Sequence, residues 1–438
     1  MESARLDEAD IRQIQSRGLS VADVLNQLET LRRGVKPLVI DRPCTMGDGI
    51  EPIAPERMEE WAALHDAAAA AGRMMVFVPA SGAATRMFRD WYRVLEAGGF
   101  ASPEAAEEFA ATLPEYAFYG DLEAVLRRDG TDADTLLREG KHADIIARIL
   151  TPQGLNYGQL PKALLKFHAD GGGGRTALEE HLAEAARYVS SSEGLCRVHF
   201  TVSGEYLEAV RNHLCEVGPR CEAELGVRFH VTFSTQSAAT DTLAVDLENR
   251  PFRTPEGRLV FRPGGHGALL SNLDAVGGDL VFIKNIDNIV PDRLKAGTVR
   301  YKKVLGGILV ALQEEVRRFQ RRLAAGGYGE RDLSAIARFC EEKLHVGFPA
   351  DFARRPSADR AAFLQSKLAR PLRVCGMVRN EGEPGGGPFW VLGDDGAPSP
   401  QIVEAFQVDA DSDVQKARWA AATHFNPVDL VCGVRDAS

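Results

Sequence analysis

The sequence has few of the features that mark membrane, secreted or nucleic-acid-binding proteins. No stretch approaches the roughly 18 uninterrupted apolar residues of a membrane-spanning helix, and residues 1–5 begin no apolar signal-peptide core. Lys and Arg number 52 against 62 Asp and Glu, whereas a nucleic-acid backbone needs a concentrated basic surface. We therefore expect a cytoplasmic protein with neither a membrane nor a nucleic acid as its partner.

The cysteines and histidines also form none of the common metal-binding or disulfide motifs. The seven cysteines are odd in number, scattered and without a CxxC pair, and the ten histidines form no HExxH motif. Small buried hydrophobic side chains are the best interpretation of these cysteines. The pattern argues against a disulfide framework and against a zinc site.

Apolar residues make up 45% of the 438 positions, which is enough for a large core in one elaborated domain or in two to three smaller ones. Short apolar runs alternate with stretches of helical spacing, and this alternation predicts a mainly parallel sheet with helices on both faces. Strands are predicted at 74–78, 196–202, 228–233, 242–245 and 280–283. Helices are predicted at 177–189 and 204–217, among others.

The same patterns predict how the chain is organised. Residues 1–72 are expected to be helical, and residues 73–302 to form an α/β core that is interrupted by a helical insertion at 87–159. A helical segment at 303–368 and strands in 369–438 follow, and these strands are expected to complete the core.

The loop after the run at 74–78 is the first candidate for function. Its small residues let backbone N–H groups face an anion, and its arginine can grip a phosphate with two hydrogen bonds. It matches neither GxxxxGK(S/T) nor GxGxxG, and a tight turn capped by Ser81 is the alternative. The candidate phosphate contacts are Ala80, Ser81, Gly82, Ala83, Thr85 and Arg86.

Two further motifs could serve a nucleotide. Lys162 follows Pro161, which fixes the start of an apolar segment, and such a lysine could stabilise charge on a phosphate during transfer. An ordinary helix start with a solvated lysine is the alternative.

The second motif is a glycine-rich turn after an apolar strand, where the backbone can approach a planar base closely. A simple hairpin or strand-end loop is the alternative. The motif contains Gly264, Gly265, His266 and Gly267.

Acidic residues at the ends of strands predict a metal site. Asp287 and Asn288 follow the run at 280–283, and ligands of open parallel sheets bind beyond the carboxyl ends of strands. Mg²⁺ prefers few carboxylates together with phosphates and water, which suits Asp287 assisted by Asp429. An Asx turn is the alternative.

The C-terminal part offers carboxylates and amides that could hold an acceptor molecule, with Phe389 and Trp390 as an apolar floor. Exposed surface turns are the alternative for these charged residues. The candidate acceptor contacts are Asn288, Gly376, Glu383, Glu404 and Asn426.

Taken in order, these motifs resemble the UDP-sugar pyrophosphorylase group of sugar-1-phosphate nucleotidyltransferases. Residues 82–86 correspond to the GxGTR loop, Pro161-Lys162 to the Pro-Lys motif and 200–203 to a strand that ends in Thr-Ser. Phe233-Ser234-Thr235-Gln236 corresponds to Phe-x-Gln, 263–267 to Pro-Gly-His-Gly and Asp287-Asn288 to Asp-Asn. The whole chain also resembles an uncharacterised bacterial family, domain of unknown function 4301.

Two features depart from the UDP-sugar pyrophosphorylase pattern. Ala83-Ala84 replaces the second glycine of the loop, and residues 87–159 separate the loop from Pro161-Lys162. We interpret this long insertion as one that folds out and returns the chain to the site, where it could act as a lid.

The resemblance implies a GT-A-like α/β fold with a mixed sheet and a reaction in which NMP passes from an NTP, with UTP favoured, to a sugar-1-phosphate or related phosphate. Arg86 would bind the leaving pyrophosphate, Lys162 the α-phosphate, and Asp287 the Mg²⁺. Gln236, Gly265 and His266 would frame the base, and Glu404 and Asn426 the acceptor. A GT-A glycosyltransferase and a non-catalytic nucleotide-binding protein are the alternatives. The oligomeric state is left open.

Overall fold

A computed structural model describes residues 6–82, 84, 87–169, 173–382, 385–393 and 396–435. The chain contains α-helices together with both parallel and antiparallel strand pairs, so the predicted mixed α/β class is confirmed. It divides into two compact units. The first unit comprises 1–64, 236–277 and 305–438, and the second comprises 65–235 and 278–304. Each is therefore built from stretches that are far apart in the sequence.

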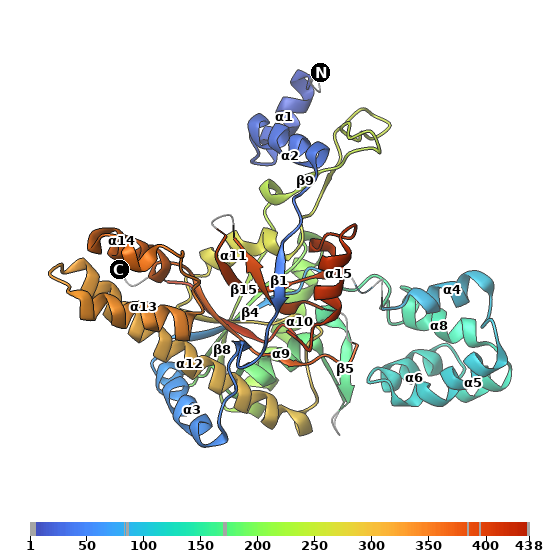
Figure 1. Ribbon diagram of the computed structural model, residues 1–438. Coiled ribbons are helices and arrows are strands. Elements are labelled where there is room, and N and C mark those ends of the chain that lie inside the picture. The colour runs from blue at the N-terminus through green and yellow to red at the C-terminus, as the bar shows by residue number, and fades with distance from the viewer. Residues whose placement is uncertain are drawn as a thin grey trace. The chain divides into compact units, whose positions relative to one another are not determined.

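The second unit contains four parallel strands in the order β11, β4, β7, β8. Figure 1 labels β4 and β8. Every residue of β4 is buried, as expected for a parallel strand covered on both faces. The four strands predicted for this sheet are confirmed to within one residue of their ends. Their bounds are Met74–Pro79 for β4, Leu195–Thr201 for β7, Arg228–Ser234 for β8 and Leu280–Ile283 for β11.

Helix α9 (Ala177–Ala185) contacts β7 and α10 (Leu207–Leu225), and all nine of its residues are buried. Thr176 caps its first turn through a capping box with Glu179, which explains where the helix begins. Short elements lie before α9 and α10. They are η3 (Lys162–Leu164), β5 (Lys166–Ala169), β6 (Gly174–Thr176) and η4 (Gly204–Tyr206).

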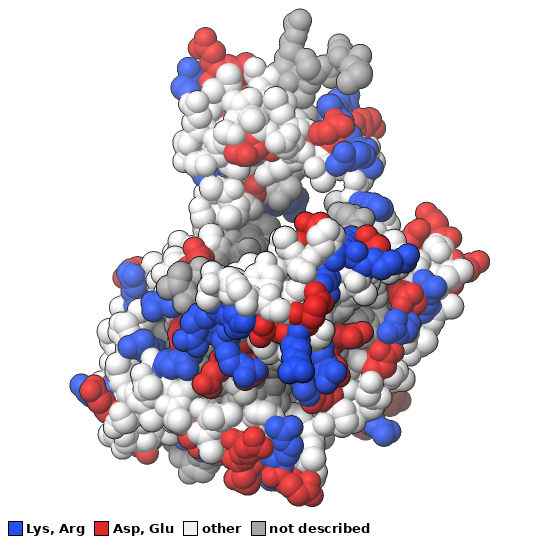
Figure 2. Space-filling view, turned by 60° about the vertical axis from the view of Figure 1, so that its left-hand side comes forward, with Lys and Arg blue, Asp and Glu red and all other residues white. Residues whose placement is uncertain are grey.

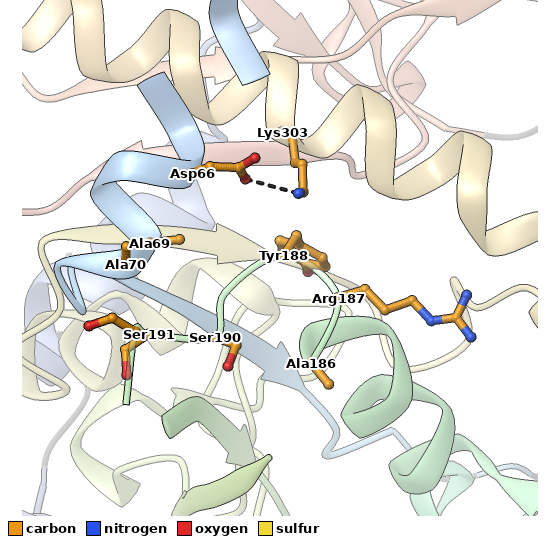
Figure 3. A pocket seen from close by; sticks show the side chains of 10 residues that line it. Asp66, Ala69, Ala70, Ala186, Arg187, Tyr188, Ser190, Ser191 and Lys303 are labelled. Atoms are coloured by element: carbon orange, nitrogen blue, oxygen red, sulfur yellow. Dashed lines mark ion pairs between the residues drawn. The ribbon is translucent and has the colours of Figure 1, made fainter. Parts of the chain in front are cut away.

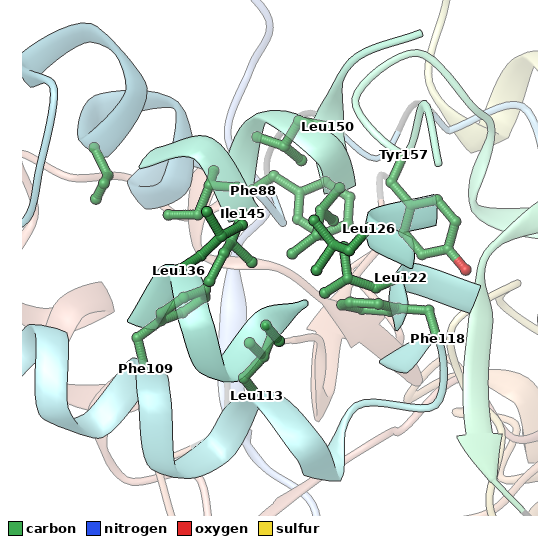
Figure 4. Packing of buried hydrophobic residues seen from close by; sticks show 14 of the residues in the cluster. Phe88, Phe109, Leu113, Phe118, Leu122, Leu126, Leu136, Ile145, Leu150 and Tyr157 are labelled. Carbon is green, nitrogen blue, oxygen red and sulfur yellow. The ribbon is translucent and has the colours of Figure 1, made fainter. Parts of the chain in front are cut away.

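Residues 87–159 fold into a small helical lobe with its own apolar core (Figure 4). Leu113, Leu122 and Ile145 are among its fully buried side chains. Ser102 and Asp132 cap two of its helices. The elements are α4 (Arg89–Ala97), α5 (Pro103–Thr112), η2 (Leu113–Glu115), α6 (Tyr119–Arg128), α7 (Ala133–Arg138) and α8 (His142–Leu150).

In the first unit, an N-terminal helix pair packs on a β-hairpin through an apolar cluster that includes Ile14 and Leu259. Arg253 donates to both carboxylate oxygens of Asp10 at 2.7 and 2.8 Å, and these hydrogen bonds are the main reason why the pKa of Asp10 lies below its ordinary value. The elements are α1 (Glu8–Ser16), α2 (Val21–Arg33), β9 (Thr242–Leu243) and β10 (Phe261–Arg262).

Residues 40–50, which lie in the region expected to be helical, form strands instead. Pro37 and Pro43 oppose a helix here, and Gly47 and Gly49 adopt positive φ angles of 84° and 86°. Strand β1 (Ile40–Pro43) pairs in antiparallel fashion with β14, which pairs with β15. The other strands are β2 (Thr45–Met46), β3 (Gly49–Ile50), β12 (Leu372–Cys375), β13 (Val378–Arg379), β14 (Gly387–Leu392), β15 (Pro398–Val403), β16 (His424–Phe425) and β17 (Leu430–Gly433).

Helices α3 and α12 contribute residues to both units, and α13 and α14 build a separate apolar cluster around Leu333 and Leu364 in the first. None of the helices in the described part of the chain is both long and apolar enough to span a bilayer. The remaining bounds are α3 (Pro55–Ala70), η5 (Ala238–Thr240), η6 (His266–Leu269), α11 (Leu270–Ala275), α12 (Asp292–Ala324), α13 (Glu330–Leu344), η7 (Phe352–Arg354), α14 (Ser357–Leu368), η8 (Ala405–Gln407) and α15 (Asp413–Ala420).

Candidate functional site

The loops that follow β4 and β7 are joined at the carboxyl edge of the parallel strands. Ala80 N donates to Thr201 O at 2.7 Å, and Ser203 Oγ donates to Ser81 O at 3.1 Å. Because β11 runs parallel to β4, the residues that follow β11 also leave the sheet at this edge. The edge is therefore where predicted motifs from distant parts of the sequence can meet.

Lys162 and Asp287, which are 125 residues apart, form an ion pair at this edge between Lys162 Nζ and Asp287 Oδ2. Lys162 N also donates to Gly82 O at 3.4 Å, which joins the Pro-Lys segment to the loop after β4. The Lys162 side chain is 20% exposed and the Asp287 side chain 42%, so both can be reached from solvent. The structure thus brings together Ser81, Gly82, Lys162 and Asp287.

The segment that carries Asp287 is held by backbone bonds on both sides. Lys284 N continues the sheet by donating to Phe77 O at 3.1 Å, and Asn288 N closes a turn by donating to Asn285 O at 3.1 Å. Between them, Ile286 O accepts a hydrogen bond from His181 Nε2 at 3.1 Å. The predicted acceptor contact Asn288 therefore lies in the same turn as Asp287.

The donor set around Asp287 fits a magnesium ion that takes most of its ligands from phosphates and water. Asp287 offers a single, partly exposed carboxylate, and Mg²⁺ is commonly held by one or two carboxylates plus substrate oxygens. Within the described ranges, no group of three or more His, Cys, Asp or Glu side chains is placed to hold an ion alone. Asp429, the other predicted ligand, belongs to the first unit.

In the first unit, Gln236 lies beside Gly264. A Cβ on Gly264 would come within 2.9 Å of Ala268 Cβ and 3.0 Å of Thr240 O, so close packing requires glycine here. Gln236 Nε2 would be 3.7 Å from that Cβ, and it is buried without a hydrogen-bond partner among the described residues. An unpaired buried amide donor is costly, and a ligand acceptor would relieve that cost.

Gly265 and Gly267 differ from Gly264. A Cβ added to either glycine would meet no atom within 4 Å. Packing therefore does not explain these two glycines, and their predicted role in nucleotide binding stays a prediction.

The predicted acceptor residues of the first unit also lie near one another. Asn426 N donates to Gly386 O at 2.9 Å, and a Cβ on Gly386 would lie 3.5 Å from Glu404 Cγ. Asn426 Nδ2 donates to Gly376 O at 2.7 Å, and Asn426 Oδ1 accepts from Val428 N at 3.0 Å. The buried Asn426 side chain therefore fixes a turn, because both ends of its amide are engaged within the protein.

The remaining predicted residues cannot be placed in this geometry. Ala83, Thr85, Arg86 and Glu383 lie outside the described residues, and His266 is described only in its backbone. Their assigned roles are expectations from the sequence.

A family model for a domain of unknown function, DUF4301, matches residues 7–438. The chain belongs to the DUF4301 family. A comparison with curated proteins found no match.

Solved structures similar to this DUF4301 chain include the UDP-N-acetylglucosamine pyrophosphorylase of Trypanosoma brucei, with 14% identity and a TM-score of 0.46 over 98% of this chain and 62% of that one. A UDP-glucose pyrophosphorylase variant of Leishmania major in complex with UDP-glucose is 12% identical, with a TM-score of 0.39. The match covers 98% of this chain and 64% of that one. A T. brucei UDP-glucose phosphorylase is 12% identical, with a TM-score of 0.40. The match covers 97% of this chain and 62% of that one. The DUF4301 chain thus spans less than two thirds of the length of each.

Sequence reasoning missed a group of buried charges beneath the site in this DUF4301 protein. Glu184 Oε2 accepts from Lys284 Nζ at 3.1 Å, and Lys295 pairs with Glu180. All four of these side chains are buried, as is Lys302, whose Nζ lies 3.9 Å from Glu184 Oε1. The cluster was hard to find because Glu-Glu-His at 179–181 reads as the solvated face of a helix.

A hollow of about 220 Å³ lies near the opposite edge of the sheet, because it is lined by segments that precede β4 and β7 (Figure 3). Ser190, Ser191 and Ser192 line it. The cations at its wall are already paired, Lys303 with Asp66 at 2.9 Å and Arg187 with Asp292 at 3.3 Å. No predicted site residue lines this hollow.

Surface charge is mixed in sign. On the face shown in Figure 2, Lys and Arg side chains lie among Asp and Glu side chains.

Proposed function

We propose that this DUF4301 protein is a nucleotidyltransferase with a GT-A-like core. It transfers NMP from a nucleoside triphosphate, with UTP favoured, to a sugar-1-phosphate or related phosphate, and it releases pyrophosphate. The observation that carries the proposal is the Lys162–Asp287 ion pair beside the loop at Ser81 and Gly82. An ammonium group and a carboxylate at the carboxyl edge of parallel strands can serve a triphosphate and its metal.

In the proposed reaction, a phosphate oxygen of the acceptor attacks the α-phosphorus in line. The new O–P bond forms as the bond from the α-phosphorus to the bridging oxygen breaks, and the electron pair leaves with pyrophosphate. Lys162 would stabilise negative charge on the α-phosphate. Mg²⁺, when bound, would neutralise phosphate charge, and Asp287 would hold it.

Other roles rest on the resemblance and stay predictions. Arg86 would bind the leaving pyrophosphate, and Asp429 would assist Asp287 with the metal. Gln236 with the turn at 264–267 would frame the base. Glu404 and Asn426 would contact the acceptor, Asn426 through a turn whose amide is already engaged.

The test is pyrophosphate release from a matrix of nucleoside triphosphates and sugar phosphates, with and without Mg²⁺. Lys162→Ala and Asp287→Ala should each lower kcat at least about a hundredfold, the loss expected when one preorganised electrostatic group is removed. Lys141→Ala is the control, because Lys141 pairs with Glu139 on the helical lobe at 2.8 Å and is well exposed.

The outcomes separate the proposal from its alternatives. Near-normal turnover by either site variant would contradict the role assignment. Transfer or hydrolysis of a nucleotide sugar without pyrophosphate chemistry would point to a glycosyltransferase instead. Nucleotide binding with no turnover on any acceptor would indicate a non-catalytic binding protein.

A further inference from the structure

Helix α9 is an unusual support for a site, because it is wholly buried and carries charge. Its nine residues include Glu179, Glu180, His181 and Glu184, all of them buried. Burial is the main reason why the pKa of His181 falls to about 3, so the imidazole is neutral at physiological pH. A neutral ring carries one N–H, and the contact to a carbonyl places it on Nε2.

Two side chains of α9 hold the segment that carries Asp287. Glu184 Oε2 accepts from Lys284 Nζ at 3.1 Å, three residues before Asp287. His181 Nε2 donates to Ile286 O at 3.1 Å, at the residue directly before Asp287. The segment is thus fixed through a side chain and through its backbone.

The same helix supports the segment that carries Lys162. Ala177 N, in the first turn of α9, donates to Leu165 O at 3.0 Å. Leu165 N in turn donates to Lys162 O at 3.1 Å, and η3 contacts α9. The segments that carry the two partners of the Lys162–Asp287 ion pair are therefore both bonded to α9. This explains how residues 125 positions apart are held next to each other.

Stability alone is a poor explanation for these buried charges. Removing an ammonium group and a carboxylate from water is costly for each ion, and well-packed apolar residues are often as stable as a buried ion pair. Hydrogen bonds to charged or neutral polar groups do, however, fix direction and distance. Accurate placement of the Asp287 segment is a gain that an apolar helix could not supply.

We infer that His181 and Glu184 are positioning residues, which hold Asp287 where it can bind the metal of a metal–nucleotide complex beside Lys162. The inference rests on the proposed function for its chemistry. Neither residue is placed in contact with substrate. Each acts through the segment 284–288.

The test compares two buried histidines in the same unit. His65, like His181, is fully buried, and its Nε2 contacts a backbone carbonyl, that of Tyr188, at 2.6 Å. His181→Phe and His65→Phe each remove one such bond, but only the first bond lies next to Asp287. His181→Gln keeps an amide N–H for Ile286 O and is the rescue variant.

With UTP and the best acceptor, His181→Phe should lower kcat and raise the Mg²⁺ concentration for half-maximal turnover, each by about tenfold or more, the range seen when outer groups that orient a metal ligand are lost. His65→Phe should stay within about twofold of wild type, and His181→Gln within about threefold. Equal effects of His181→Phe and His65→Phe would overturn the inference. His181→Met provides a second variant if His181→Phe does not fold, because its flexible side chain also lacks an N–H donor.

Hydrogen exchange provides a readout that needs no turnover. In the ligand-free protein, amides 284–288 should exchange faster in His181→Phe than in wild type or in His65→Phe, because their tether is lost. Unchanged exchange would overturn the positioning role. If wild type releases no pyrophosphate with any substrate pair, the proposed function fails, and exchange at 284–288 then decides the positioning by itself.

Discussion

The second unit buries two groups of residues in opposite ways. The helical lobe at 87–159 closes around apolar side chains such as Leu122 and Ile145, whereas α9 places Glu180 and Glu184 against Lys295 and Lys284. An apolar core tolerates many sequences that fill the same volume. A buried ion pair tolerates few, because loss of either partner leaves an uncompensated charge. The difference suggests that the lobe is constrained mainly by shape, and α9 by the placement of specific groups.

We expect the largest effect from Glu184→Gln, which keeps the side-chain size and removes the charge. Lys284 and Lys302 then lose the carboxylate that both contact, and we expect a loss of about 3–5 kcal/mol in the free energy of unfolding. Urea denaturation measures the loss. Glu208→Gln, which removes the partner of Arg211 in an exposed pair, should cost no more than about 1 kcal/mol. Similar losses in the two variants would show that the buried charges of α9 contribute no more to stability than an exposed ion pair does.

Leu122→Ala is the corresponding change in the lobe. Leu122 is fully buried in α6, and we expect a cost of about 2–5 kcal/mol from lost burial and a residual cavity. Because the lobe has its own core, faster hydrogen exchange should be confined to 89–150 and leave β4 and β7 unchanged. An equal rise in exchange across the sheet would show that the lobe does not fold as a separate cooperative region.

The smallest effect concerns a buried polar group that carries no charge. His199 on β7 contacts Thr232 Oγ1 at 2.7 Å and Ser234 Oγ at 2.8 Å, and burial lowers its pKa to about 4. The unfolded chain, with a histidine pKa near 6.5, binds more protons between pH 6.5 and 4, so stability falls as the pH falls through this window.

His199→Gln should therefore make the dependence of unfolding free energy on pH shallower by about 1.2 kcal/mol per pH unit between pH 6 and 5. Urea midpoints at several pH values, in wild type and variant, measure this difference. Parallel curves would mean that His199 is not held in its neutral form by the fold.

The strands of the parallel sheet could be predicted because their apolar runs are short and uninterrupted. Helix ends were harder to predict. The sequence pattern predicts a helix over 204–217, but α10 continues through Pro219 and ends at Leu225, although proline usually breaks a helix. The strand expected at 242–245 shortens to 242–243 before the hairpin that follows.

The candidate site was predictable in part. The types of Lys162 and Asp287 and their order along the chain pointed to phosphate chemistry, but only the fold shows that their side chains meet. The buried charges of α9 could not be predicted, because Glu and Lys at helical spacing normally indicate exposure. Their partners come from α12 and the end of β11, more than 90 residues away.

The Lys162–Asp287 ion pair also bears on which ligands the site can select. An anion that displaces Asp287 from Lys162 leaves a carboxylate without its partner, and a cation that displaces Lys162 leaves an ammonium group without its own. Each loss offsets part of the gain from binding, by about 1 kcal/mol or less for a pair whose side chains are partly exposed. A ligand that brings a phosphate and a divalent cation together satisfies both groups at once. Under the proposed function, the resting pair would therefore favour a complex of phosphate and metal over free phosphate or free metal.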